Sequence, residues 1–320
     1  MKSTSELTDF YYKTLYPTLE SLEKQRKNVR DRVVVVGILY TLASIALFFL
    51  LSSFKNLPDD FFSFFAVAYF GLGAIIYKFL TKEYTSDFKN RVIEPLIHAI
   101  DEGLSYMSDL HIPTEYFTKS ELFGTFDKIE GNDYVKGIVN DVPIEFSDLH
   151  AQKRHVDSKG RERWDTIFQG LFIVSEFNKN FQGKTVVLPD TAQNLFGDLI
   201  GGWLQSNNIG RGELVKLDDI EFEKEFVVYS TDQIEARYIL SHSLMQRLLT
   251  FKQKSKHPLY VSFVGESIHM AIYYNKDLFE ASVFHSLLNY KIAMEYVTTL
   301  HLAISIVDEL KLNQKLWSKQ

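Results

Sequence analysis

The stretch VVVVGILYTLASIALFFLLSSF, from Val33 to Phe54, contains no charged side chain. A helix of about 22 residues is roughly 33 Å long, which matches the hydrocarbon core of a bilayer at about 30 Å. A second uncharged run, FFSFFAVAYFGLGAIIY, extends from Phe61 to Tyr77 and reaches Leu80 if the ammonium group of Lys78 snorkels to the membrane surface. Both runs are predicted to form membrane-spanning helices.

Only the sequence KNLPDD, residues 55–60, separates the two runs. Pro58 and the two following carboxylates favour a turn over a continued helix. We therefore expect a tight transmembrane hairpin over residues 33–80, with spans at 33–54 and 61–80 joined by a short outer loop.

Two other interpretations of these runs are weaker. A buried helical hairpin of a soluble protein is disfavoured, because helices that are hydrophobic on every face are rare outside membranes. A cleaved signal peptide has an apolar region of about 7–15 residues close to its N-terminus. Here about 32 residues precede a longer run, and a second run follows. The first helix is expected to remain in the protein.

Positive charge flanks the hairpin on one side. Cations lie before the first span and after the second, namely Lys24, Arg26, Lys27, Arg30, Arg32, Lys78, Lys82, Lys89 and Arg91. The positive-inside rule then predicts that both termini are cytoplasmic and that the short loop faces outward. Because neither uncharged run contains an ionisable group of the kind that marks an ion path, an anchor is favoured over a pore.

Amphipathic segments border the spans. Residues 1–32 are predicted to hold a cytoplasmic amphipathic helix with Pro17 in its first turn. Residues 81–111 are predicted to form a juxtamembrane helix with a kink at Pro95. The apolar faces of both segments favour packing in a core over binding to a partner.

From residue 112 the pattern changes to alternating apolar and polar residues, which is typical of half-buried strands. DSKG, residues 157–160, predicts a hairpin turn, and residues 164–177 its returning strand. Strands are also expected in KTVVLPD, in EKEFVVYS, and in YVSFVG and SIHMAIYY, which would form a hairpin around Gly265.

Helices are expected between these strands. Asp190 is predicted to cap a helix that runs through Trp203, and Ser230 with Gln233 to form a capping box. Ser241 is predicted to cap another short helix, and residues 287–312 to form a long amphipathic one. The fold class is therefore α+β: a two-helix transmembrane hairpin followed by a cytoplasmic domain, residues 112–320, with a mostly antiparallel sheet and flanking helices.

Composition excludes several classes of function. The net charge of −6 and the absence of a long basic stripe outside the membrane flanks argue against nucleic acid as a partner. Since the chain has no cysteine, disulfides, thiolate metal sites and cysteine nucleophiles are excluded.

No motif indicates chemistry. None of the nine histidines lies in a metal-helix pattern, and the triplet Ser241-His242-Ser243 is better explained by the capping role of Ser241. Gly201-Gly202 follows no strand, which argues against a phosphate-binding loop. We predict no catalytic residue, no metal site and no cofactor.

The predicted hairpin around DSKG is rich in cations. They are Lys153, Arg154, Lys159, Arg161 and Arg163. Such a tip is a candidate contact for anionic lipid or another anion, with about 1 kcal/mol from each cation near a charged surface. A merely solvated hairpin remains the alternative.

Seven segments follow one another in a specific order. They are FYYKTLYPTLESLEKQRK, FKNRVIEPLI, SELF, DYVKGIVNDVPIEFSDL, GLFIVSEFNKNFQGKTVVLPD, STDQIEARYILSHSLMQRLL and LYVSFVGESIHMAIYY. This order resembles the bacterial DUF3137 family, whose function is unknown. His242 stands where relatives often have proline. The resemblance implies a cytoplasmic domain anchored in the bacterial inner membrane, and it carries over no functional residue.

These observations lead us to expect a membrane-tethered binding or scaffold domain without catalytic activity. Its partners would be the bilayer and either another protein or further copies of the chain. A module that binds the inner leaflet through the basic hairpin is the alternative, and an enzyme acting on membrane substrates is a third.

Overall fold

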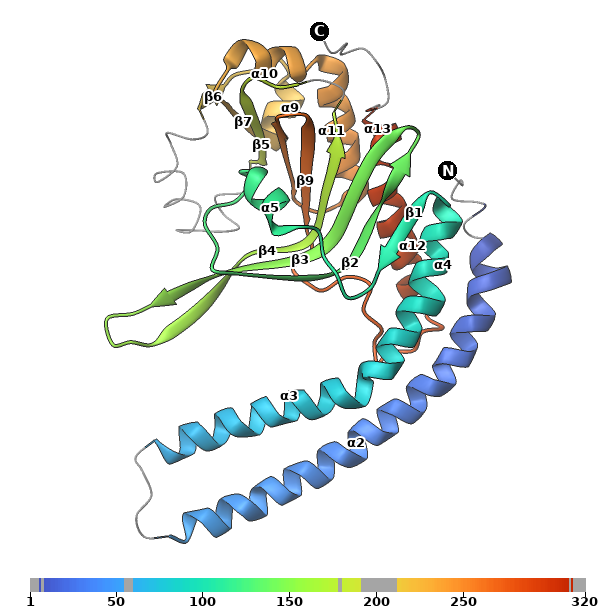
Figure 1. Ribbon diagram of the computed structural model, residues 1–320, viewed down its shortest axis with the longest axis vertical. Coiled ribbons are helices and arrows are strands. Elements are labelled where there is room, and N and C mark those ends of the chain that lie inside the picture. Colours follow the sequence, from blue (N-terminus) through green and yellow to red (C-terminus); the bar gives the residue numbers. More distant parts are fainter. Residues whose placement is uncertain are drawn as a thin grey trace. The chain divides into compact units, whose positions relative to one another are not determined.

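The computed structural model describes residues 6, 9–54, 60–177, 180–190, 212–310 and 312. They divide into two compact units. The helical unit comprises the described residues within 6–95 and 280–295, and the sheet unit those within 96–279 and 296–312. The colours in Figure 1 follow the sequence, and the long helices of the helical unit are blue to cyan.

The helical unit is dominated by two long helices, α2 (Tyr16–Ser52) and α3 (Phe61–Phe88). The most apolar stretch of the first has a mean hydropathy of 2.6 with none of it buried, and that of the second 1.6 with 6% buried. Both are long and apolar enough to cross a membrane. Their low burial distinguishes them from core helices of a soluble domain.

The two long helices pack through aromatic side chains. The rings of Tyr40 and Tyr69 stack with centroids 5.1 Å apart, and the Tyr40 hydroxyl donates to the Tyr69 carbonyl at 2.7 Å. Nearer the loop, Phe48 contacts Phe61 and Phe65. Such close packing with a few polar contacts is how helices associate in lipid, where hydrophobicity does not favour one apolar neighbour over another.

Both predicted helical flanks differ in detail from the structure. A π-helical stretch, η1 (Tyr11–Leu15), precedes α2, and Pro17 lies in the first turn of α2 as predicted. A second π-helical stretch, η2 (Lys89–Ile93), leads directly into α4 (Glu94–Ile100), which contains Pro95. Proline has no N–H for the ordinary helical hydrogen bond, and the irregularity lies just before it.

The prediction of a helix over 81–111 is wrong beyond Ile100. Leu104–Met107 forms strand β1, which pairs with residues 134–137 of β2 (Lys128–Val139). Apolar spacing alone suggested a helix, and a strand distant in sequence provides the competing partner.

The sheet unit is built on nine strands in the order β1-β2-β3-β4-β9-β8-β5-β7-β6. Every pairing in it is antiparallel, which confirms the α+β class. The remaining strands are β3 (Val142–Val156), β4 (Glu162–Glu176), β5 (Lys184–Pro189), β6 (Glu213–Val215), β7 (Phe226–Ser230), β8 (Leu259–Val264) and β9 (Ser267–Tyr273). The predicted hairpins at 157–160 and at Gly265 are confirmed.

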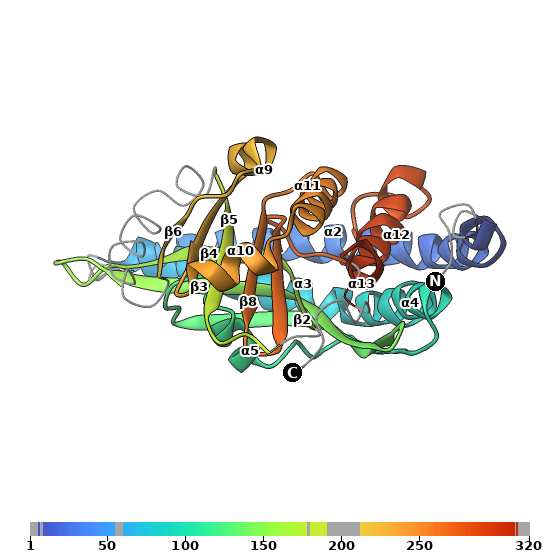
Figure 2. The same cartoon turned by 90° about the horizontal axis from the view of Figure 1, so that it is seen from above.

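Short helices flank the sheet. They are α5 (Thr114–Lys119), α9 (Ile220–Glu225), α10 (Gln233–Ile239), α11 (His242–Ser255), α12 (Tyr290–Ile304) and α13 (Ile306–Glu309). Within the sheet unit, α5 lies on one face of the sheet and α11 on the other (Figure 2). Under α5, a core cluster joins Phe117 to Phe168, Phe172 and Tyr260.

The predicted helix caps are confirmed in part. Ser241 accepts from the Leu244 amide and caps α11 as expected. The capping box at Ser230 is wrong, because Ser230 ends β7 and Asp232 caps α10. The helix expected over 287–312 is divided at Ser305 into α12 and α13. The helix expected from Asp190 through Trp203 lies outside the described residues.

Candidate functional site

Strands β3 and β4 extend beyond the rest of the sheet as a two-stranded arm, residues 153–165. The last pair between β2 and β3 is Lys128 with Gln152, and β9 begins to pair with β4 only at Gly170. Along the arm, β3 and β4 therefore pair with each other and with no other described strand. The arm is the light green projection in Figure 1.

Asp157 organises the turn of the arm. The Gly160 amide donates to the Asp157 carbonyl at 2.9 Å, and Gly160 adopts a φ of +75°, which glycine tolerates without strain. The Asp157 carboxylate accepts from the amides of Lys159 and Arg161 at 2.8 and 2.9 Å. These bonds, that from Arg161 first, hold the pKa of Asp157 below its usual value. The four-residue signal at 157–160 was sufficient to predict this turn.

The structure brings the five predicted cations onto this one arm, which also carries the three carboxylates of Asp157, Glu162 and Asp165. The ion pairs are Arg154 with Glu162 at 3.2 Å, Arg161 with Asp157 at 2.7 Å and Arg163 with Asp165 at 2.8 Å. Lys153 donates to the Thr125 hydroxyl at 2.7 Å. Five cations against three carboxylates leave the arm with a net charge of +2 when His155 is neutral. The arm is basic, with a smaller excess than the cations alone suggest.

The register divides the arm into two faces. Because residues directly opposite one another in an antiparallel pair share a face, Arg154 lies beside Trp164, and Val156 beside Glu162, on the first face. Lys153 with Asp165 and His155 with Arg163 lie on the second face. The first face exposes two apolar side chains, with Val156 55% and Trp164 44% exposed.

The sequence pattern alone did not indicate Trp164 and Val156 as candidate site residues. The available signal was the period of two in a strand, which places Arg154 and Val156 on one side. The pairing of Arg154 with Trp164 depends on the register, which the turn sets.

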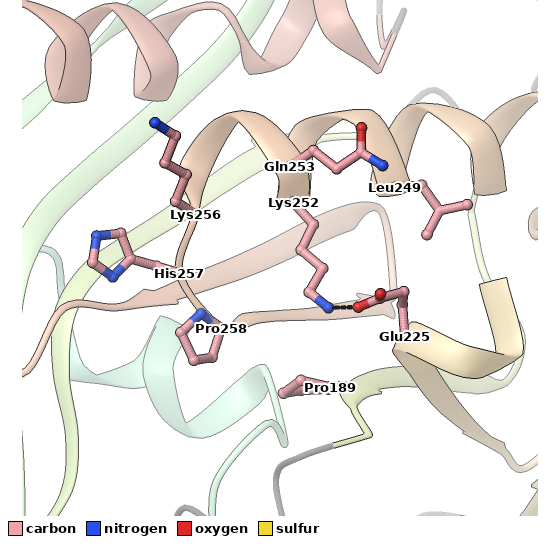
Figure 3. Close-up of a pocket in the computed structure, with 8 residues that line it drawn as sticks. All are labelled: Pro189, Glu225, Leu249, Lys252, Gln253, Lys256, His257 and Pro258. Carbon is pink, nitrogen blue, oxygen red and sulfur yellow. Dashed lines mark ion pairs between the residues drawn. The ribbon is translucent and has the colours of Figure 1, made fainter. Parts of the chain in front are cut away.

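A pocket of about 330 Å³ lies beside α11 (Figure 3). Its lining residues are Pro189, Glu225, Leu249, Lys252, Gln253, Lys256, His257 and Pro258. Figure 3 shows the Lys252 ammonium pointing at the Glu225 carboxylate, with which it forms an ion pair. That ammonium also lies 5.5 Å from the centroid of the Phe226 ring.

Burial lowers the pKa of Lys252, and the nearby Asp190 carboxylate partly opposes this shift. The pair with Glu225 neutralises the charge of Lys252 within the pocket. The lining comes from segments that are far apart in sequence, so no local motif indicated the pocket.

His269 is a second polar group that the sequence did not single out. It is 2% exposed and lies opposite Ser262 on the neighbouring strand. The ring atom Nδ1 of His269 and the hydroxyl of Ser262 are buried without a hydrogen-bond partner among the described residues. Burial lowers the pKa of His269 to about 4, so the ring is neutral at physiological pH.

No group of three or more His, Asp or Glu side chains that could hold a metal lies among the residues that the structure describes. His242 places its Nδ1 3.1 Å from the Asp219 carboxylate, while the Ser241 hydroxyl accepts from the Leu244 amide. Ser241 therefore has the capping role that the sequence indicated.

Comparison with known proteins finds one family. A family model described as "Protein of unknown function (DUF3137)" matches residues 166–312. This match confirms the resemblance to DUF3137 predicted from the sequence. The matched range contains the segments from GLFIVSEF onward, and the earlier segments that suggested the resemblance lie outside it.

No curated protein matches the chain. Among solved structures, the crystal structure of the mycobacterial trehalose monomycolate transport factor A, TtfA, is similar with a TM-score of 0.34 and 10% identity. The similarity covers 67% of this chain and 95% of that one.

Proposed function

We propose that this chain is a non-catalytic, membrane-tethered binding module. The hairpin of α2 and α3 anchors it in the bacterial inner membrane with both termini in the cytoplasm. There the sheet unit recruits a protein partner or further copies of the chain. The observation that supports the proposal is that α2, Tyr16–Ser52, is one unbroken helix with buried charged residues near its start and exposed apolar side chains toward its end.

The C-terminal part of α2 and most of α3 suit lipid. Large apolar side chains there are between 45 and 79% exposed, namely Val34, Val35, Ile38, Leu39, Leu42, Ile45, Leu47, Phe49, Leu50, Phe62, Phe64, Val67, Phe70, Leu72, Ile75 and Phe79. Apolar exposure on this scale is rare on soluble proteins and normal for helices in a bilayer.

The other ends of the same two helices suit a folded protein. Glu23, Arg26 and Lys89 are at most 7% exposed. They hold a strap, residues 280–288, of the helical unit: the amide of Leu287 donates to Glu23 at 3.0 Å, and Lys89 pairs with Glu280 at 2.8 Å. The Tyr84 hydroxyl adds a bond to the carbonyl of Ser282 at 3.1 Å.

The strap follows residue 279 of the sheet unit in sequence and leads into α12. The buried polar contacts of the strap lie within the helical unit, and the chain connects that unit covalently to the sheet unit at α4 and at both ends of the segment that contains the strap. This arrangement supports a tether that is part of the fold, as a membrane-bound recruiting domain requires.

The membrane topology can be tested with single cysteines, because the chain has none of its own. A membrane-impermeant maleimide should label Asp60→Cys in intact spheroplasts and should label Lys224→Cys only after the membrane is permeabilised. Labelling of Lys224→Cys in intact spheroplasts would overturn the cytoplasmic placement of the sheet unit. Labelling of both sites with the chain in the soluble fraction would overturn the anchor.

Recruitment can be tested on the full chain purified from membranes in mild detergent. We expect a stoichiometric protein partner, identified by mass spectrometry, or a homo-oligomer, measured by light scattering. Membranes from cells that express the protein without an affinity tag are carried through the same purification as the control. A monodisperse monomer with no partner would contradict the proposal.

A further inference from the structure

We propose that the arm lies with its first face, formed by Arg154, Val156, Glu162 and Trp164, on the anionic surface of the membrane that anchors the chain. The occupants of this face are the head groups of anionic phospholipids. The inference rests on the proposed membrane tether and adds a second, peripheral contact with the same bilayer.

The composition of the first face favours an interface between water and lipid. Tryptophan concentrates at the level of the lipid head groups, because its ring is mostly apolar and its N–H still needs a polar partner. Val156 is the more exposed of the two apolar side chains, and both are on the face that carries Arg154. The ion pair of Arg154 with Glu162 borders this apolar surface, and the positive excess of the arm comes from the tip and the second face. Apolar side chains next to an excess of cations are the pattern of segments that lie in the plane of a membrane interface.

Charge favours anionic over zwitterionic lipid. The tip adds Lys159 and Arg161 against the single carboxylate of Asp157, and the Arg161 side chain is 77% exposed. The net charge of the arm is positive, although the whole chain has a net charge of −6. This local reversal of sign directs the arm, and not the chain as a whole, toward a negative surface.

The arm has few other sources of stability. A two-stranded hairpin is marginally stable in water, and along the arm neither strand has a second described strand as neighbour. Contact with a surface that accepts both its apolar and its cationic side chains would stabilise the extended conformation.

Tethering makes a weak contact sufficient. A chain already held in the bilayer meets the membrane surface at a high effective concentration, so the second contact forms within one molecule. An arm with two exposed apolar side chains and a small positive excess therefore needs much less affinity for lipid than a soluble protein would need to reach the membrane.

The test uses a variant of the full chain in which Trp164 is the sole tryptophan. The other two, Trp203 and Trp317, are replaced by phenylalanine. The protein is reconstituted in nanodiscs of phosphatidylcholine alone or of phosphatidylcholine and phosphatidylglycerol in equal parts. Fluorescence of Trp164 is measured with brominated acyl chains, which quench from within the lipid, and with iodide, which quenches from water.

In the anionic nanodiscs we expect quenching by brominated lipid and protection from iodide, and both effects should weaken in phosphatidylcholine alone and at high salt. The triple variant Arg154→Glu, Lys159→Glu and Arg161→Glu should lose both effects. The matched control Lys216→Glu, Lys224→Glu and Lys256→Glu changes the total charge equally at exposed positions of the sheet unit and should keep them.

Iodide access to Trp164 without quenching by brominated lipid in the anionic nanodiscs would overturn the inference. Protection from both quenchers would also overturn it, because Trp164 would then be covered by protein and would contact neither lipid nor water. If the protein fails to enter nanodiscs, the anchor itself fails. If it enters and Trp164 remains in water, only the inference about the arm fails.

Discussion

Arg26 donates a hydrogen bond of 2.6 Å to the carbonyl of Val283, 257 residues later in the chain. The same guanidinium pairs with both carboxylate oxygens of Glu23 at 2.8 and 2.9 Å. Glu23 in turn accepts from the Leu287 amide. Two buried charges on α2 thus satisfy one another and two backbone groups of the strap, which is the condition under which a buried ion pair is tolerated.

Replacement of one member of this pair should be costly. Arg26→Met leaves the Glu23 carboxylate buried without its counter-ion, and we expect a loss of about 3–5 kcal/mol in the free energy of unfolding. Chemical unfolding of the full chain in mild detergent measures the loss. Arg30→Met is the matched control, because Arg30 pairs with Asp31 on the exposed surface and should cost less than about 1 kcal/mol.

The double variant Glu23→Leu and Arg26→Met separates charge from packing. It removes both charges together, so it should be more stable than Arg26→Met alone. Equal stability of Arg26→Met and Arg30→Met would show that the buried pair does not hold the strap.

His269 should make the stability depend on pH. Its pKa falls to about 4 in the folded protein because of burial, whereas that of an unfolded histidine is about 6.5. A lowered histidine pKa means that the unfolded chain binds more protons between these values, so stability is complete above about pH 6.5 and falls toward pH 4. The expected loss between pH 7 and pH 5 is about 2 kcal/mol.

The contribution of His269 is isolated by comparison with His269→Gln, which does not titrate. Unfolding midpoints measured from pH 7 to pH 5 should decline more steeply in the natural protein than in the variant. Parallel declines would mean that His269 has no lowered pKa in the folded state.

Local patterns in the sequence predicted those parts of the fold that depend on a few adjacent residues. The uncharged runs of α2 and α3, the turn at 157–160 and the cap at Ser241 are of this kind. Leu104–Met107 is the contrasting case, because its strand structure depends on residues 134–137, about 30 positions away, and its own spacing suggested a helix.

The candidate site shows the same division. The five cations of the arm were visible as a cluster in sequence, and their cluster in space follows from the turn. Their pairing with carboxylates and the exposure of Trp164 depend on the register of β3 against β4, which is a property of the sheet. The strap contacts of Arg26 join positions too distant for any local pattern to reveal.

Gly170 is predicted to be a position where only glycine fits. Its φ is +150°, and a Cβ built there would lie 2.2 Å from the carbonyl oxygen of Ile272, which is backbone of β9 and cannot swing away. Gly170→Ala should therefore lower the free energy of unfolding by about 3 kcal/mol or more. Thermal unfolding in detergent provides the measurement.

Gly265 supplies the control for backbone strain without a clash. It has a φ of +62°, but no atom lies within 4 Å of a Cβ built on it. Gly265→Ala should cost about 1 kcal/mol. A loss at Gly170 no larger than that at Gly265 would show that β9 can move aside.

The sequence pattern predicts Ser230 as part of the cap of α10, but in the structure Asp232 is the cap. The Asp232 carboxylate accepts from the amides of Ile234 and Glu235 at 2.9 and 3.0 Å. Asp232→Ala should cost about 1 kcal/mol, and Asp232→Asn should keep most of the stability because its amide oxygen accepts the same bonds. Hydrogen exchange of the two amides localises the effect: they should lose protection in Asp232→Ala alone, and unchanged protection there would assign the cap elsewhere.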